Sequence, residues 1–598
     1  MAVEEVNSFN DDETERCKFA RKALAVARLE RLRNMLSAGN DVISSQTAMS
    51  FLAAVIPFCD IGALFRMVED SKRASNEVEL LAGSVRCFIR GKERAISQKC
   101  GKEDVEILLE STTVLLSLCT ASTESGCVVF RTSVVSDLVR CSRFVLVLPH
   151  SQPLPSSNAL LRGVFALCRF GLAAFTLTDS RRRGKQRDVD EVSKLLSLIV
   201  DLLRDARGEL ALEGLEHVLV PLLDAYAKFC EKSNRTELCA RSTWNEIQRI
   251  VAKLISLRKG VPRETRTALF RVFCMCSAIL GRNFFTNPSG NSRVEAPAVL
   301  PTGWKFAALM SNCAATEMRL FLTPIAQAAL NSSEEFRLES FVTSSALAVA
   351  AMEAVERIMQ ALSAGDETDD LPEPMIAGAA SDDEQEAVVA VVHAIEVALE
   401  FLESLGDMLP DCCKRAPPET ETSSGEIVAH EVLIHLAMAN SRLVSCFALL
   451  ELPVFADRVA RNLCRTAYVF NLRLRAELFI DAMPTLLPGL RFICGDVEQN
   501  ESELNCYEVA RVLREWLDLV RCSDVLNGIE DSQMVELATA AVLDCTLGTS
   551  TTSAVEVSRT RDCIGALAEK YRGLNQLSAE SKAARLRLEH MHNELCLR

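Results

Sequence analysis

The sequence predicts an all-α protein, an armadillo- or HEAT-like α-solenoid of stacked helix pairs. Helical periodicity recurs in stretches of roughly 15 to 25 residues from near the start of the chain to its end, while alternating strand patterns are scarce. Hydrophobic residues make up 49% of the chain but aromatic residues only 6%, a balance typical of aliphatic helix-on-helix packing. Successive helix pairs span roughly 40 residues, the size of a repeat in such arrays.

The clearest helical pattern lies in the segment 188–208, DVDEVSKLLSLIVDLLRDARG. Acidic residues open it, Gly208 follows it, and its apolar residues recur at steps of three and four: Val189, Val192, Leu195, Leu196, Ile199, Leu202 and Leu203. The next segment, LEGLEHVLVPLLDAYAKF, repeats this pattern across a very short joint, and Pro221 is expected to kink it. Upstream, VVFRTSVVSDLVRC resembles the armadillo pattern in which a short turn leads into an apolar helix, although no strict repeat period is present.

Polar breaks divide the predicted array. The sequence predicts N-terminal helical repeats over 1–285, a loop over 286–303, central helices over 304–363, an acidic flexible loop over 364–386, and C-terminal repeats over 387–598 with a polar loop at 411–426. The acidic loop is interpreted as solvated, and binding of a basic partner is its alternative role. The basic turn at 180–187 is likewise interpreted as solvated, and a phosphate or lipid contact is its alternative role.

Composition limits the partners and the location. The formal net charge of −15 argues against a general nucleic-acid binder and favours basic peptides or basic protein patches. The acidic start lacks a secretory signal, so we expect a cytoplasmic protein. No integral membrane segment is expected, because Asp60 and Arg169 interrupt the two most apolar runs. The 23 cysteines contain no CxxC pair and are interpreted as reduced core thiols, as at Cys168, Cys446 and Cys494.

The segment HEVLIH, residues 430–435, is one residue longer than the HExxH helix of zinc proteases. His430 and His435 are five residues apart, which places them about 140° around a regular helix, so both imidazoles cannot reach one metal ion without a π-bulge. No phosphate loop, dinucleotide fingerprint or nucleophile elbow is present either. The sequence therefore predicts no catalytic residues, no metal site and no cofactor. A metal-dependent hydrolase built on His430, Glu431 and His435 is the alternative.

The segment Leu300–Leu322, LPTGWKFAALMSNCAATEMRLFL, resembles the neurochondrin family. The matching positions are Lys305, Phe306, Ala308, Leu309, Asn312, Ala314, Glu317, Arg319 and Leu320. EAVVAVVHAIEVALEFL and the C-terminal ALAEKYRGLNQLSAESKAARLRLEHM are similar to later helices of that family, whereas the N-terminal third departs most. These nine residues, which we call the signature residues, form either a packing joint or a partner-facing patch.

The resemblance implies a cytosolic, non-enzymatic helical-repeat scaffold or adaptor that binds protein partners and modulates signalling. In animals the family is associated with neurite outgrowth, with restraint of calmodulin-dependent kinase phosphorylation, and with receptor and vesicle-traffic adaptors. Kinases and receptor tails are therefore the partner classes it implies. A cargo-carrying transport or vesicle-traffic adaptor that responds to a small GTPase is the alternative.

Overall fold

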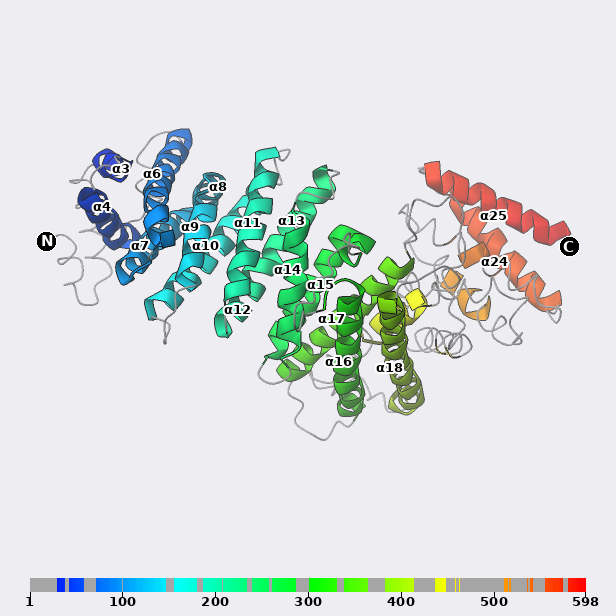
Figure 1. Ribbon diagram of the computed structural model, residues 1–598. Helices are drawn as coiled ribbons and strands as arrows, with labels where there is room; N and C mark the ends of the chain where they lie inside the picture. Colours follow the sequence, from blue (N-terminus) through cyan, green and yellow to red (C-terminus); the bar gives the residue numbers. More distant parts are fainter. Residues whose placement is uncertain are drawn as a thin grey trace, which may run out of the picture. The chain divides into compact units, whose positions relative to one another are not determined.

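The protein is described here by a computed structural model (Figure 1). The structure describes residues 29–37, 42–58, 71–98, 100–146, 155–179, 186–206, 208–233, 239–257, 261–286, 301–330, 338–363, 382–413, 436–447, 554–573 and 579–597, with scattered positions between 458 and 542. These residues form helices and the turns between them, with no strand among them, so the predicted fold class is confirmed. The chain divides into two compact units, Met1–Leu280 with Ala296–Leu300, and Gly281–Glu295 with Pro301–Arg598.

The first unit is a stack of helix pairs arranged in two layers. Layer A contains, in chain order, α3 (Leu29–Ser37), α6 (Ser71–Gln98), α9 (Val134–Leu146), α11 (Gln186–Asp205) and α14 (Arg241–Ile255). Layer B contains α4 (Val42–Val55), α7 (Lys102–Ala121), α10 (Pro155–Asp179), α13 (Val220–Ser233) and α15 (Arg263–Leu280). Each layer A helix packs against its layer B partner and against the next helix of its own layer. This arrangement is the predicted α-solenoid, and Figure 1 shows the stack from blue to green.

The armadillo-like segment forms a short helix, a tight turn and a buried helix, as its sequence predicts. The short helix, α8 (Thr123–Arg131), packs on α7 and α10, and the Ser122 hydroxyl caps its start by accepting a hydrogen bond from the Ser125 N–H at 3.1 Å. Ser133 then turns the chain with a φ of 58°, in the left-handed region that few residues other than glycine adopt. The hydrophobic side chains that follow in α9, such as Val134 and Leu138, are fully buried.

The two helices predicted around Gly208 are present, and the joint between them is short. Gly208 has a φ of 57°, and α12 (Glu209–Gly214) begins directly after it. Where the sequence predicted a kink at Pro221, the structure has a π-helical turn, Leu215–Leu219, just before α13. Proline lacks an N–H and its ring crowds the carbonyl four residues earlier, so a wider turn accommodates it within a continuous helical path.

The second unit continues the pattern of alternating helices. Its central helices are α16 (Trp304–Leu330), α17 (Leu338–Ser363) and α18 (Asp382–Cys413), and α16 packs against both of the others. Ion pairs of Lys305 with Asp383 and of Arg319 with Glu400 join α16 to α18 in the same order along both helices, so these two helices run parallel. Near the C-terminus, α24 (Ala554–Gly573) packs on α25 (Ala579–Leu597).

Polar contacts also join α17 and α18 to residues further along the chain. Arg442, in the helical residues 436–447, donates two hydrogen bonds to Glu356 of α17, one of them from Nε at 3.0 Å. Arg458 donates to both carboxylate oxygens of Glu403 on α18 at 2.7 Å. Among the described residues of the second unit, α17 and α18 are therefore each linked to later residues of the chain.

Some predicted loop boundaries differ from the structure. Helix α18 begins at Asp382, inside the predicted acidic loop 364–386, and it ends at Cys413, inside the predicted polar loop 411–426. Asp382, Asp383 and Glu384, which the prediction placed in the acidic loop, occupy the first turn of α18, where negative charge is stabilised by the helix dipole. The rest of both predicted loops, 287–300, and 180–185 of the basic turn lie outside the described residues.

The cysteines in the described part of the chain are free thiols. Cys168 is buried as predicted, and burial raises the pKa of its thiol far above the ordinary value. Burial also raises the pKa of Cys119 to about 12 and that of the half-buried Cys446 to about 11. Cys494 lies outside the described residues. These neutral thiols behave as small core residues.

Candidate functional site

The structure divides the signature residues of α16 between the core and the surface. Phe306, Ala308 and Ala314 are fully buried, Leu309 is half-buried, and Glu317 is 8% exposed. The remaining signature residues are exposed: Lys305, Asn312, Arg319 and Leu320. One stripe of the segment therefore packs within the second unit while the opposite stripe faces outward. Glu317 and Arg319 are not brought together, because two residues along a helix point to nearly opposite sides.

Two of the exposed signature residues, Lys305 and Arg319, make ordinary surface ion pairs. The Lys305 ammonium lies 3.3 Å from Asp383, and the Arg319 guanidinium lies 3.7 Å from Glu400. All four side chains are at least 44% exposed, so water and salt screen both pairs. The packing stripe of α16 therefore contributes far more to stability than its charged stripe does.

We expect Arg319→Ala to change the free energy of unfolding by less than about 0.5 kcal/mol, because it removes only an exposed ion pair. Lys305→Ala is the matched case at the other end of the same helix. Urea denaturation of both variants measures the effect. A loss above about 1 kcal/mol in either variant would show that the charged stripe holds α16 to α18.

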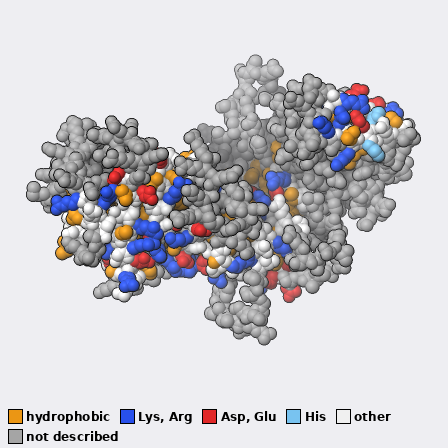
Figure 2. All heavy atoms as spheres, turned by 90° about the horizontal axis from the view of Figure 1, so that it is seen from above, with side chains coloured by type: hydrophobic (Ala, Val, Ile, Leu, Met, Phe, Trp, Pro, Cys, Tyr) orange, Lys and Arg blue, Asp and Glu red, His pale blue; other side chains and the backbone are white. Residues whose placement is uncertain are grey.

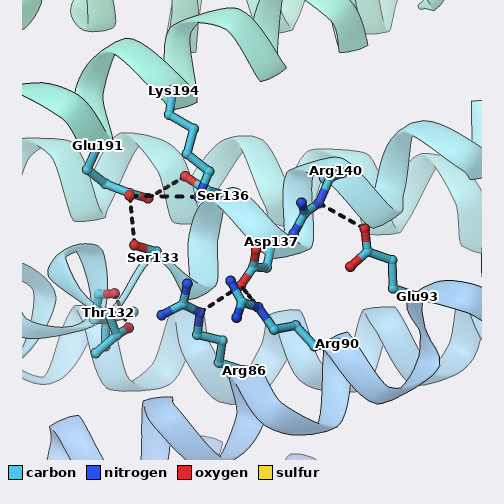
Figure 3. A network of polar contacts seen from close by, with 11 residues as sticks. Arg86, Arg90, Glu93, Thr132, Ser133, Ser136, Asp137, Arg140, Glu191 and Lys194 are labelled. Carbon is cyan, nitrogen blue, oxygen red and sulfur yellow. Dashed lines mark hydrogen bonds and ion pairs between the residues drawn. The ribbon is translucent and has the colours of Figure 1, made fainter.

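A larger polar arrangement lies on layer A of the first unit, centred on Asp137 (Figure 3). The Asp137 side chain is buried, and its Oδ2 accepts hydrogen bonds from the Nε atoms of Arg86 and Arg90 at 2.7 and 2.8 Å. Arg140 contacts the other oxygen of the same carboxylate and also lies 3.1 Å from Glu93. One buried carboxylate thus organises three guanidinium groups between α6 and α9.

Helical spacing brings these groups together. Arg86 and Arg90 are four residues apart on α6, and Asp137 and Arg140 are three apart on α9, so each pair lies on one side of its helix. Burial alone would raise the pKa of Asp137, but the hydrogen bonds and positive charges of Arg86 and Arg90 outweigh it and lower that pKa. Asp137 is therefore ionised at neutral pH.

The polar contacts extend along layer A from one repeat to the next. Each contact joins neighbouring helices of the layer, as the contacts of Asp137 join α6 to α9: Arg33 on α3 with Glu77 on α6, Ser133 just before α9 and Ser136 on α9 with Glu191 on α11, Arg143 on α9 with Asp201 and Asp205 on α11, and Ser197 on α11 with Thr243 on α14. We call this series the polar ladder. It links every consecutive helix of layer A, and Figure 2 shows Lys, Arg, Asp and Glu side chains close together on the described surface.

The polar ladder was not predicted from the sequence. Its one available signal was the armadillo-like segment, which contains Ser133, Ser136, Asp137 and Arg140. The apolar residues of that segment were recognised, but its single internal carboxylate in a buried stretch was not. A buried Asp must be paired or hydrogen-bonded, so this position could have been identified as the centre of a charge network.

The proposed zinc residues are not tested by the structure, because His430, Glu431 and His435 lie outside the described residues. Within the part of the chain that is described, no group of three or more His, Cys, Asp or Glu side chains is arranged to hold a metal ion. The absence of a metal and of a cofactor therefore stays a prediction.

One described helix, Ser156–Leu177 within α10, is long and apolar enough to cross a membrane by length and composition. The expectation that Arg169 interrupts this run is therefore too strict, since two exposed arginines, Arg162 and Arg169, leave the rest of the helix apolar. More than half of the helix is buried, and α10 packs on α7, α8 and α9. A core helix of a folded domain has the same properties.

No family model matches this chain, and no curated protein matches its sequence. Among solved structures, an engineered protein is 13% identical with a TM-score of 0.40, over 89% of this chain and 99% of that one. Kap121p is 12% identical with a TM-score of 0.23, over 100% of this chain and 66% of that one. The Rif1 N-terminal domain from Saccharomyces cerevisiae is 10% identical with a TM-score of 0.17, over 98% of this chain and 71% of that one. Because every TM-score is below 0.5, these likenesses carry no argument about function.

Proposed function

We propose that this chain is a non-enzymatic scaffold or adaptor that binds protein partners along layer A. One observation carries the proposal: the polar ladder runs across consecutive helices of that layer and leaves charged groups accessible to a partner. Lys194 and Arg249, for example, are 41% and 47% exposed on α11 and α14. A stack of helices offers an extended surface on which a partner contacts several repeats at once.

The resemblance of α16 to the neurochondrin family supports a narrower form of this proposal. In that form the chain acts in the cytoplasm and modulates signalling, with kinases or receptor tails as partners. The division of the signature residues is compatible with α16 acting both as a packing joint and as a partner-facing patch. Its buried residues pack within the second unit, and its exposed residues are accessible to a partner. Restraint of phosphorylation by a calmodulin-dependent kinase is the activity to assay first.

The test is affinity capture of partners with the full chain and two charge-reversed variants. The layer A variant carries Lys194→Glu and Arg249→Glu, and the matched layer B variant carries Lys102→Glu and Lys228→Glu, whose side chains are 72% and 60% exposed. Quantitative mass spectrometry compares the proteins retained by each. We expect the layer A variant to lose stoichiometric partners that the wild type and the layer B variant retain.

Two outcomes would contradict the proposal. Equal losses in both variants would show that net charge rather than layer A decides binding. The absence of stoichiometric partners from the wild type, at both low and moderate salt, would contradict the scaffold function itself. Circular dichroism of each variant establishes that its helices are intact.

The non-enzymatic part of the proposal has its own test. We expect protein purified without chelator to contain far less than one zinc ion per chain, because the five-residue spacing of His430 and His435 separates the two imidazoles on a regular helix. Elemental analysis measures the metal content. One zinc ion per chain that is lost in His430→Ala, but not in His393→Ala, would instead support a metal-dependent hydrolase.

A further inference from the structure

We propose that four arginines on α6 and α9 form a docking point for an acidic segment of a protein partner. The arginine cluster consists of Arg86, Arg90, Arg94 and Arg140, and it would bind the carboxylates of Asp and Glu side chains. This inference rests on the proposed function in that it places the contact on layer A. It goes beyond that function by assigning the site and the chemistry of the partner.

The hydrogen bonds of the cluster leave donors free for a ligand. A guanidinium carries five N–H donors, yet Arg86 and Arg90 each use only Nε toward Asp137. Among the described residues their Nη groups donate no further hydrogen bond. The Arg90 side chain is 51% exposed and that of Arg86 is 28% exposed, and Figure 3 shows the two guanidiniums side by side. These outward N–H groups match the two oxygens of a carboxylate.

Arg94 extends the cluster along α6. It follows Arg90 by four residues, so it lies on the same side of the helix. Its side chain is exposed and makes no polar contact with the described part of the chain. Arg86, Arg90 and Arg94 therefore form a row of guanidiniums along one helix, with Arg140 beside it on α9.

The local charge balance identifies the sign of the partner. Four arginines face two carboxylates, those of Asp137 and Glu93, which leaves a surplus of two positive charges. The next polar group along layer A is balanced, because Arg143 and Arg204 face Asp201 and Asp205. The surplus stands out on a chain whose net charge is −15. The overall charge favours basic partners, whereas this surface fits an acidic one.

The buried carboxylate holds the guanidiniums of the cluster in a fixed arrangement. Asp137 fixes the guanidiniums in place before a partner arrives, which reduces the entropy lost on binding. The two oxygens of a planar carboxylate match the N–H groups that Arg86 and Arg90 do not use toward Asp137, and a phosphoserine peptide is the competing ligand that the test compares with it. Several such carboxylates spaced along one segment would pair with the row on α6.

The test measures binding of a fluorescein-labelled polyglutamate peptide to the full chain by fluorescence anisotropy. We expect Arg90→Gln combined with Arg94→Gln to weaken binding about tenfold or more, since two charge-assisted contacts are lost. The matched control combines Arg162→Gln with Lys228→Gln on α10 and α13, which removes the same charge from exposed positions of layer B. We expect that control to change the affinity by less than about twofold. Arg90→Lys keeps the charge but not the planar fork, and an intermediate loss is expected.

Three outcomes would overturn the inference. They are an equal loss in the control, no binding of polyglutamate to the wild type, and tighter binding of a phosphoserine peptide than of polyglutamate. These failures are distinct from failure of the scaffold function. If partners are captured through layer A while polyglutamate does not bind, only the acidic docking point is wrong. Circular dichroism again verifies that each variant keeps its helices.

Discussion

Replacing Asp137 with alanine is expected to lower the free energy of unfolding by about 2–4 kcal/mol. The substitution removes the carboxylate that accepts hydrogen bonds from Arg86 and Arg90 and contacts Arg140. The three guanidiniums are then left to repel one another between α6 and α9. Because their side chains are 28% to 51% exposed, water compensates part of the loss, so the effect stays below that of a fully buried pair. Urea denaturation followed by circular dichroism measures it.

Two variants separate the causes of that loss. Asp137→Asn keeps the shape of the side chain but removes its charge, so most of the destabilisation is expected to remain. Asp224→Ala removes a carboxylate that is 51% exposed and pairs with Lys228 within one helix, and it is expected to change stability by less than about 0.5 kcal/mol. A similar small effect of Asp137→Ala would contradict the central position given to this residue.

The lowered pKa of Asp137 predicts how its contribution depends on pH. A carboxylate whose pKa is lower in the folded state contributes stability above its unfolded pKa, and that stability is lost as the pH falls through the folded pKa. We therefore expect the stability difference between wild type and Asp137→Asn to be constant above the ordinary Asp pKa of 3.8 and to shrink below it. Denaturation curves across acidic pH test this, and a difference that grows on acidification would refute it.

The second large effect is expected at Gly214, where α12 approaches its neighbours most closely. An added Cβ would lie 2.6 Å from Leu203 Cδ2 and 2.6 Å from Phe165 Cζ, far inside van der Waals contact. Both side chains are buried, so neither moves aside freely. Alanine favours a helix over glycine by up to about 1 kcal/mol, but this overpacking outweighs the gain. We expect Gly214→Ala to destabilise the protein by about 1–3 kcal/mol, measured by urea denaturation.

The matched control is Gly91→Ala on α6, where an added Cβ would meet nothing within 4 Å. Here only the helical preference of alanine acts, so this variant is expected to be about 0.5–1 kcal/mol more stable than the wild type. Opposite signs for the two glycines would establish close packing between α10, α11 and α12. If Gly214→Ala were also stabilising, the packing described there would be wrong.

The sequence predicted the helices in which apolar residues form one stripe that packs against neighbouring helices. In α11, Val192, Leu195 and Ile199 recur at helical spacing, and all three are buried. Pro221 predicted a disturbance at the correct place, but not that it would be a π-helical turn, because the chain's response to a proline depends on what packs around it. At Asp382 the composition suggested a loop where a helix begins, since helix-start residues and loop residues share the same acidic character.

The polar ladder lay beyond sequence-based prediction. Carboxylates and arginines are common on helix surfaces throughout the chain. The position of a charged residue on one helix does not identify which residue of a neighbouring helix it contacts. Asp137 meets Arg86 and Arg90 because α6 and α9 stack in one particular register, although they are not consecutive in the chain. The signature residues show the same limit, because their family resemblance did not reveal which ones are buried and which are exposed.

Hydrogen–deuterium exchange of the full chain, with and without a captured partner, tests most directly whether layer A is the binding face. The proposed function predicts that the partner slows exchange in α6, α9, α11 and α14, and that it leaves exchange in α4, α7 and α10 unchanged. Slower exchange confined to the layer B helices, with layer A unchanged, would contradict it.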